Sequence, residues 1–146
     1  MAAAPEKIGP YRVIRKLGEG GMGAVYEGLH ELIERKVAIK ILRPEYAVQP
    51  EFTARFFNEA RAVNRVDHPG LVQISDYGQL PDSTAYIVME FLNGETLASR
   101  LKTRGTALSL DNALNFGSQL ADALAAAHEK NVIHRDLKPD NVMIVS

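Results

Sequence analysis

The chain has 146 residues, of which 46% are hydrophobic and 24% charged, as expected of a globular domain and not of a disordered chain. Seventeen basic and eighteen acidic residues leave a net charge of −1, which argues against nucleic acid or an anionic membrane as the main partner. The absence of cysteine excludes disulfides and thiolate metal sites, and no apolar run approaches the roughly 18 residues of a membrane helix. We therefore expect a cytoplasmic protein.

The first part of the chain has the pattern of a sheet with one helix. Residues 1–10 carry no periodicity and are expected to form a flexible leader. Short β-branched and aromatic runs then predict strands at residues 11–17, 24–29, 36–42, 71–78 and 85–90. A helix is predicted over residues 50–65, where apolar side chains recur at helical spacing. Because strands and helices do not alternate, the sheet is expected to be antiparallel.

The remainder of the chain has a helical character. A short helix is predicted over residues 97–104, and Ser109 is expected to cap a long helix that runs to about Lys130. Asn131 suits the left-handed conformation that ends helices. A strand is expected to begin at Val142. The sequence thus predicts an α+β fold with a change of character near residue 90.

The glycines of Gly18-x-Gly20-x-x-Gly23 lie between two predicted strands. A dinucleotide-binding fingerprint would follow a strand and open a helix, so this context favours a glycine-rich hairpin whose backbone amides can approach phosphates closely. The alternative is a plain flexible turn without a ligand.

Two charged residues, Lys40 and Glu59, point to a phosphate-binding pair. Strand alternation places Lys40 on the same face as Ala38, and Glu59 falls on the apolar face of the predicted helix, seven residues after Phe52 and four before Val63. A carboxylate buried there would need a partner, and Lys40 is the natural one. The alternatives are a surface lysine and a glutamate at the edge of the helix that reaches water.

The run from His134 to Asn141 carries the strongest chemical signal. Asp136 can accept a proton from a hydroxyl group, and Lys138 can neutralise charge on a transferring phosphoryl group. Asn141 can bind a hard cation through its amide oxygen. His134 is expected to have a structural role.

With these motifs in order, the chain resembles the eukaryotic-type protein kinases, and most closely their bacterial serine/threonine branch. The resemblance covers residues 11–146 and implies a kinase N-lobe over residues 11–90, made of a five-stranded antiparallel sheet plus one helix, and an incomplete, mainly helical C-lobe over residues 91–146. It implies transfer of the γ-phosphoryl group of ATP, with Mg²⁺, to serine or threonine hydroxyls of proteins. Lys138 matches serine/threonine kinases better than tyrosine kinases.

The resemblance also implies the role of each site residue. Asp136 would be the catalytic base, Lys138 the γ-phosphate contact and Asn141 a Mg²⁺ ligand, while Lys40 would hold the α- and β-phosphates and pair with Glu59. The residues expected around the nucleotide are Leu17, Gly18, Glu19, Gly20, Gly21, Met22, Gly23, Ala24, Val25, Ala38, Lys40, Met89, Glu90, Leu92 and Met143.

The chain departs from the family at one motif, because it contains no Asp-Phe-Gly, whose aspartate holds the principal Mg²⁺ in the family. We therefore expect the 146-residue polypeptide to be inactive or nearly so. Two alternatives stay open, namely a non-catalytic module that binds nucleotide or a partner, and a fragment of an interrupted reading frame. Bacterial relatives often carry a membrane anchor after the kinase domain, about which these residues say nothing.

Overall fold

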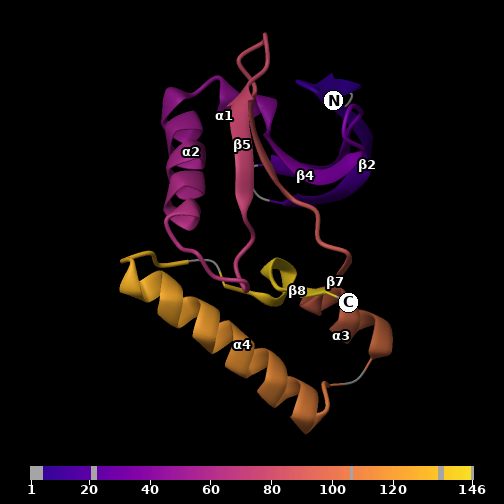
Figure 1. Cartoon of the computed structure of the whole chain (residues 1–146), viewed down its shortest axis with the longest axis vertical. Coiled ribbons are helices and arrows are strands. Elements are labelled where there is room, and N and C mark those ends of the chain that lie inside the picture. Colours follow the sequence, from indigo (N-terminus) through magenta and orange to yellow (C-terminus); the bar gives the residue numbers. More distant parts are fainter. Residues whose placement is uncertain (1–4, 21–22, 106, 135–136, 146) are drawn as a thin grey trace. The chain divides into compact units, whose positions relative to one another are not determined.

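The computed structural model describes residues 5–20, 23–105, 107–134 and 137–145 (Figure 1). The chain divides into two compact units. The first unit comprises residues 1–64 and 72–91, and the second comprises residues 65–71 and 92–146. The change of character expected near residue 90 thus coincides with the passage from the first unit to the second, although the segment 65–71 joins the second unit.

The first unit is an antiparallel sheet with two helices. Its six strands follow the order β1-β2-β3-β4-β6-β5, and each hydrogen-bonded pair is antiparallel. The strands are β1 (Lys7–Ile8), β2 (Tyr11–Gly20), β3 (Gly23–His30), β4 (Arg35–Leu42), β5 (Ile74–Gln79) and β6 (Ala85–Glu90). The helices are α1 (Pro44–Ala47) and α2 (Pro50–Asn64), and α2 lies beside β5 (Figure 1). The predicted strands and helix are confirmed, whereas β1 and α1 are additional elements.

The expectation of a loose leader over residues 1–10 is wrong for the part that the structure describes. Lys7 and Ile8 form β1, which pairs with Arg12 and Tyr11 of β2. The Ile8 side chain is fully buried, and the amide of Val13 donates to the carbonyl of Glu6. Burial of one large apolar side chain and these backbone hydrogen bonds together hold the segment on the sheet.

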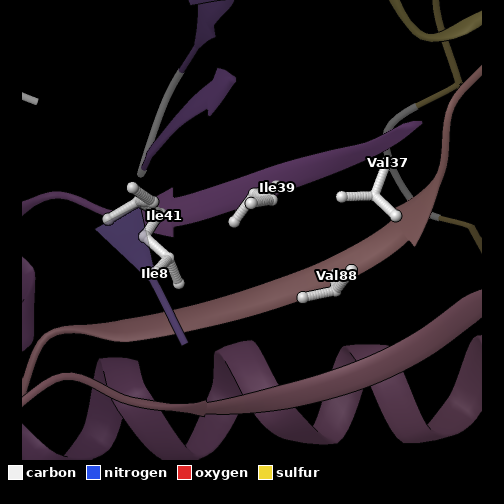
Figure 2. Packing of buried hydrophobic residues seen from close by; sticks show 5 residues of the cluster. All are labelled: Ile8, Val37, Ile39, Ile41 and Val88. Carbon is white, nitrogen blue, oxygen red and sulfur yellow. The ribbon is translucent and has the colours of Figure 1, made fainter. Parts of the chain in front are cut away.

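Side-chain alternation along β4 divides the core of the first unit between the two faces of the sheet. Val37, Ile39 and Ile41 follow one another along β4 and pack with Ile8 and Val88 (Figure 2). On the opposite face, a second cluster packs against α2 and consists of Leu42, Phe56, Ala60, Ala85 and Ile87. The predicted alternation of β4 is thus confirmed, and it places Ala38 and Lys40 on the face that α2 covers.

The second unit contains two longer helices and a two-stranded sheet. Its elements are β7 (Gly94–Thr96), α3 (Leu97–Arg104), α4 (Leu110–Glu129), the 3₁₀ turn η1 (Pro139–Asn141) and β8 (Met143–Val145). Strands β7 and β8 pair antiparallel. Helix α4 buries Ala123 and Ala127 and leaves Leu110 and Leu114 exposed. Within the described ranges, no helix combines the length and apolar character needed to cross a membrane.

The cap predicted for α4 is present, because the Ser109 hydroxyl accepts a hydrogen bond from the amide of Asn112 at 3.2 Å. We expect Ser109→Ala to lower the free energy of unfolding by about 1 kcal/mol, since one amide of the first turn loses its acceptor. Urea unfolding followed by circular dichroism measures this change. Ser109→Asp, which keeps an acceptor at the helix start, should retain most of the stability, and equal losses in both variants would contradict the capping role.

Candidate functional site

The glycine-rich segment forms the hairpin between β2 and β3. Gly18 pairs with Val25, Glu19 with Ala24, and Gly20 with Gly23. Gly21 and Met22, which the sequence also places in this loop, lie outside the described residues. The loop leads from strand to strand and not from strand to helix, which is the context that separates a phosphate-covering hairpin from a dinucleotide fingerprint.

The glycines of this hairpin are required for different reasons. A Cβ atom at Gly23 would lie 2.5 Å from the carbonyl oxygen of Ile41, so the packing of β3 on β4 demands glycine there. At Gly18 and Gly20 a Cβ would meet nothing within 4 Å, and neither residue has a positive φ. Among the described residues, neither backbone conformation nor internal packing therefore requires glycine at these two positions, and the space beside them is open to the close approach of a ligand.

Glu19 contacts one cation within the hairpin and one beyond it. Its carboxylate lies 2.9 Å from Lys16 Nζ and 3.4 Å from the guanidinium of Arg43, which follows β4. The hydrogen bond from Lys16, assisted by the charges of Lys16 and Arg43, lowers the pKa of the Glu19 carboxyl below its ordinary value. Because this pKa is lowered, the stabilisation is present at neutral pH and is lost as the pH falls through it.

Four of the expected nucleotide contacts share one face of the sheet. Val25 of β3 lies directly opposite Lys40 of β4, and Ala38 lies opposite Met89 of β6. Directly opposite residues project to the same side, so Val25, Ala38, Lys40 and Met89 form one surface, which we call the β3–β4–β6 face. Leu17 lies at the register irregularity between Lys16 and Gly18 and is 39% exposed.

Lys40 and Glu59 are not paired in this structure. The ammonium of Lys40 lies 5.9 Å from the centre of the Phe56 ring. Glu59 instead accepts a hydrogen bond from Arg55 Nε at 3.2 Å, and its side chain is 64% exposed. The expectation of a buried Glu59 paired with Lys40 is therefore wrong for this conformation, and the alternative of a glutamate at the edge of the helix is the one observed.

The geometry of α2 explains the position of Glu59. The buried residues of the helix are Phe56 and Ala60, which are one turn apart. Glu59 precedes Ala60, so it lies about 100° around the helix from it and borders the apolar stripe without belonging to it. Arg55 lies one turn before Glu59 and can reach it in water, where such a pair forms at little desolvation cost.

The end of β6 is fixed by hydrogen bonds to the segment before β5. The amide of Glu90 donates to the carbonyl of Gln73 at 3.0 Å, and the Glu90 carboxylate accepts from the Gln73 amide at 2.9 Å. Because the Glu90 amide is used within the first unit, a ligand contact from this residue would have to come from its carbonyl. Leu92, the next expected base contact, belongs to the second unit.

In the second unit, a tight turn follows the end of α4. Asn131 has a φ of 59°, as its sequence position predicts, and the amide of Val132 donates to the carbonyl of Ala127. After His134, residues Arg135 and Asp136 lie outside the described residues, so the position of the expected catalytic base is not given.

The residues after Asp136 place two further candidates on one short turn. Lys138 precedes η1, and its carbonyl accepts from the amide of Asn141 at 2.9 Å. The amide of Leu97 donates to the carbonyl of Val142 at 2.7 Å. Strand β8, which follows Val142, pairs with β7, so the segment after the turn is held by backbone hydrogen bonds. Met143, which is among the residues expected around the nucleotide, lies opposite Thr96 and is 37% exposed.

Comparison with known proteins identifies this arrangement. The family model described as "Protein kinase domain" matches residues 11–146. The chain belongs to the protein kinase family. Its curated relatives include the serine/threonine-protein kinases PknA of Mycobacterium tuberculosis, which is 44% identical over 140 residues, and PrkC of Bacillus subtilis, which is 43% identical over 136 residues.

Solved kinase structures support the same fold. The crystal structure of the PknI kinase domain of M. tuberculosis aligns with a TM-score of 0.81 and 31% identity, and covers 99% of this chain. The chain spans 59% of that structure, 32% of PknA and 21% of PrkC, whereas 93% of this chain is covered by each of the two curated relatives. The bacterial serine/threonine kinase branch expected from the sequence is confirmed.

The described residues of this kinase domain do not form a complete Mg²⁺ site. Within residues 5–20, 23–105, 107–134 and 137–145, no group of three or more His, Cys, Asp or Glu residues is placed to hold a metal. Asn141 offers one amide oxygen, whereas Mg²⁺ requires near-octahedral oxygen coordination, usually with one or two carboxylates.

One buried charge of this kinase domain was not predicted from the sequence. Glu27 on β3 is only 5% exposed, and it lies between Arg15 of β2 and Lys36 of β4. The strand pattern from Ala24 to Leu29 already placed Glu27 on the same face as Val25, which was the signal for its burial. Its partners could not be named without the strand register.

Proposed function

We propose that this chain supplies the ATP-binding and catalytic-loop residues of a serine/threonine protein kinase, which transfers the γ-phosphoryl group of ATP to hydroxyl groups of proteins. The observation that carries the proposal is the β3–β4–β6 face, where Lys40 lies beside Val25, Ala38 and Met89. Apolar side chains beside one cation suit a flat base with a phosphate chain, and the adjoining open hairpin suits the phosphates.

On this proposal each polar residue has a role that its chemistry allows. Lys40 binds the α- and β-phosphates as a point charge. Asp136 accepts the proton of the substrate hydroxyl, Lys138 neutralises charge on the transferred group, and Asn141 contributes one oxygen to the metal that the family uses. Lys138 and Asn141 lie at the two ends of the same short turn, which supports a shared role at the phosphates.

The active arrangement of this proposal requires Glu59 to exchange Arg55 for Lys40. The present pair of Glu59 with Arg55 is solvent-exposed, and such i, i+4 pairs contribute about 0.3–0.5 kcal/mol. A small rotation of α2 that brings Glu59 toward the sheet is therefore opposed by little electrostatic energy. ATP bound at Lys40 would offset this cost.

The proposal is tested by ATP affinity of the 146-residue chain, measured by fluorescence of a labelled nucleotide and by thermal stabilisation. We expect Lys40→Ala to weaken ATP binding at least about tenfold, because a phosphate contact is lost without a replacement. Lys7→Ala is the matched control, since Lys7 is an exposed lysine on an edge strand of the same sheet. Equal affinity of the wild type and both variants would refute the assignment of Lys40.

A second candidate function is nucleotide binding without phosphoryl transfer. The β3–β4–β6 face, which would bind the nucleotide, lies within the first unit, and binding there does not itself require the residues of the catalytic run. Incubation with γ-labelled ATP, Mg²⁺ and a generic protein acceptor distinguishes the two functions, with Asp136→Ala as the control. Label transfer that disappears in the control supports catalysis, whereas ATP binding without transfer supports the binding module.

A further inference from the structure

Glu27 is the one buried carboxylate among the residues that the structure describes. Its side chain accepts a hydrogen bond from Arg15 Nε at 2.7 Å and lies 3.6 Å from Lys36 Nζ. Removal of a carboxylate from water costs several kcal/mol unless it is compensated by charge and hydrogen bonds. Two cations provide this compensation, and both keep more than 60% of their own side-chain surface in water, at 63% for Arg15 and 64% for Lys36.

The three charged residues join three strands at one level of the sheet. Arg15 is the direct partner of Glu27 across β2 and β3, and Ala38 is its direct partner across β3 and β4. Lys36 lies two residues before Ala38 on the same face of β4. We call Arg15, Glu27 and Lys36 the charged clamp.

The charged clamp adjoins the residues that our proposal assigns to the nucleotide base. Val25 lies two residues from Glu27 on the same face, and Arg15 lies two residues before Leu17 on β2, with the pair of Lys16 and Tyr26 between them. Register irregularities lie on both sides of this short stretch of β2, one between Val13 and Arg15 and one between Lys16 and Gly18. Because such irregularities disrupt the ladder locally and bend the strand, the ion pair of Arg15 with Glu27 helps to fix the stretch from which Leu17 projects.

The charged clamp also contacts Phe91, the last residue of the first unit. The ammonium of Lys36 lies 5.7 Å from the centre of the Phe91 ring, which is within cation–π range. Phe91 follows Glu90, whose carbonyl is the remaining group for a hydrogen bond to the base. Through Lys36, the clamp therefore contacts the segment that would present this carbonyl.

We propose that Glu27 is a positioning residue for ATP, which through Arg15 and Lys36 fixes Leu17, Val25 and Ala38 and the segment at Phe91 for contact with the base. This inference rests on the proposed function, because it assumes that the β3–β4–β6 face binds the nucleotide. Glu27 acts through its neighbours and does not itself touch the reacting atoms. Its carboxylate is needed for its charge and geometry, not merely for the volume that it fills.

The test compares Glu27→Gln with Glu31→Gln in the 146-residue chain. Glutamine keeps the shape of the side chain but removes the charge, and the two freed cations stay hydrated. Glu31 is the matched control, since it pairs with Arg12 at the far end of the same hairpin at 3.4 Å, with both side chains at least half exposed. We expect the ATP Kd of Glu27→Gln to rise about tenfold and that of Glu31→Gln to stay unchanged.

A second measurement separates positioning from general destabilisation. Amide hydrogen exchange of Glu27→Gln should increase at Leu17, Val25 and Phe91, while exchange in α2 keeps its wild-type rate. Lys36→Gln provides an independent variant, because it releases Phe91 but leaves the bond between Arg15 and Glu27 in place. Lys36→Gln should also raise the ATP Kd, and it therefore tests the inference even if Glu27→Gln does not fold.

The outcomes distinguish this inference from the proposed function. If the wild type binds ATP and Lys40→Ala does not, but Glu27→Gln and Lys36→Gln bind as the wild type does, the positioning role is refuted and the proposed function stands. A uniform rise in exchange with an unchanged Kd would likewise make Glu27 a purely structural residue. If the wild type binds no ATP, the proposed function fails and the inference falls with it.

Discussion

Replacement of Ile8 by alanine is expected to lower the free energy of unfolding by about 2–5 kcal/mol, which is the usual cost of truncating a fully buried isoleucine. Ile8 is completely inaccessible to water and packs in the cluster of Val37, Ile39, Ile41 and Val88 (Figure 2). Alanine would leave a cavity between β1 and β4 and weaken the attachment of the N-terminal segment. Urea denaturation followed by circular dichroism measures the change.

Ile33→Ala is the control for this experiment, because Ile33 lies in the turn between β3 and β4 and is 63% exposed. Its replacement should change the stability by less than about 0.5 kcal/mol. If the two variants unfold at the same urea concentration, β1 does not belong to the cooperative core of the first unit. Deletion of residues 1–5, which retains Ile8 and the Glu6 carbonyl that accepts from Val13, should cost much less than Ile8→Ala on the same account.

The role of Ile8 shows what the sequence could not reveal about the fold. A strand of two residues has no periodicity, so the pattern of residues 1–10 resembled that of a loose leader. The four residues of α1 are likewise too few for a helical stripe. Longer elements carried a readable pattern, and residues 85–90 and 97–104 form the predicted strand and helix with the predicted bounds. Short elements depend on tertiary contacts, which local sequence does not encode.

The same distinction applies to the candidate site, where local pattern was predictable and tertiary contacts were not. Alternation correctly placed Ala38 and Lys40 on one face of β4, since a strand's side chains alternate whatever its neighbours are. Val25 joins that face only through the register of β3 on β4. The partner of Glu59 was not predictable in this way. Glu59 can contact either Arg55 or Lys40, depending on the orientation of α2. The sequence contains no information that selects one of these two cations. The burial of Glu27 was not predicted, and its two cations follow only from the register of three strands.

Glycine to alanine changes in the hairpin between β2 and β3 should separate stability from nucleotide binding. Gly23→Ala is expected to destabilise the first unit by about 1–3 kcal/mol, because the new Cβ would lie 2.5 Å from the Ile41 carbonyl oxygen and the backbone must move. Gly20→Ala should leave the stability within about 0.5 kcal/mol of the wild type, since its Cβ meets nothing within 4 Å. Urea unfolding of the two variants measures both changes.

ATP affinity should be affected in the opposite order, more by Gly20→Ala than by Gly23→Ala. The methyl group at position 20 projects into the open space where our proposal places the phosphates, so we expect the Kd of Gly20→Ala to rise about tenfold through steric exclusion of the nucleotide. Gly105→Ala provides a control for a glycine change elsewhere, although its positive φ of 64° predicts a small loss of stability. If Gly20→Ala binds ATP as tightly as the wild type, the open hairpin is a plain turn. Glycine at position 20 would then need an explanation other than a phosphate.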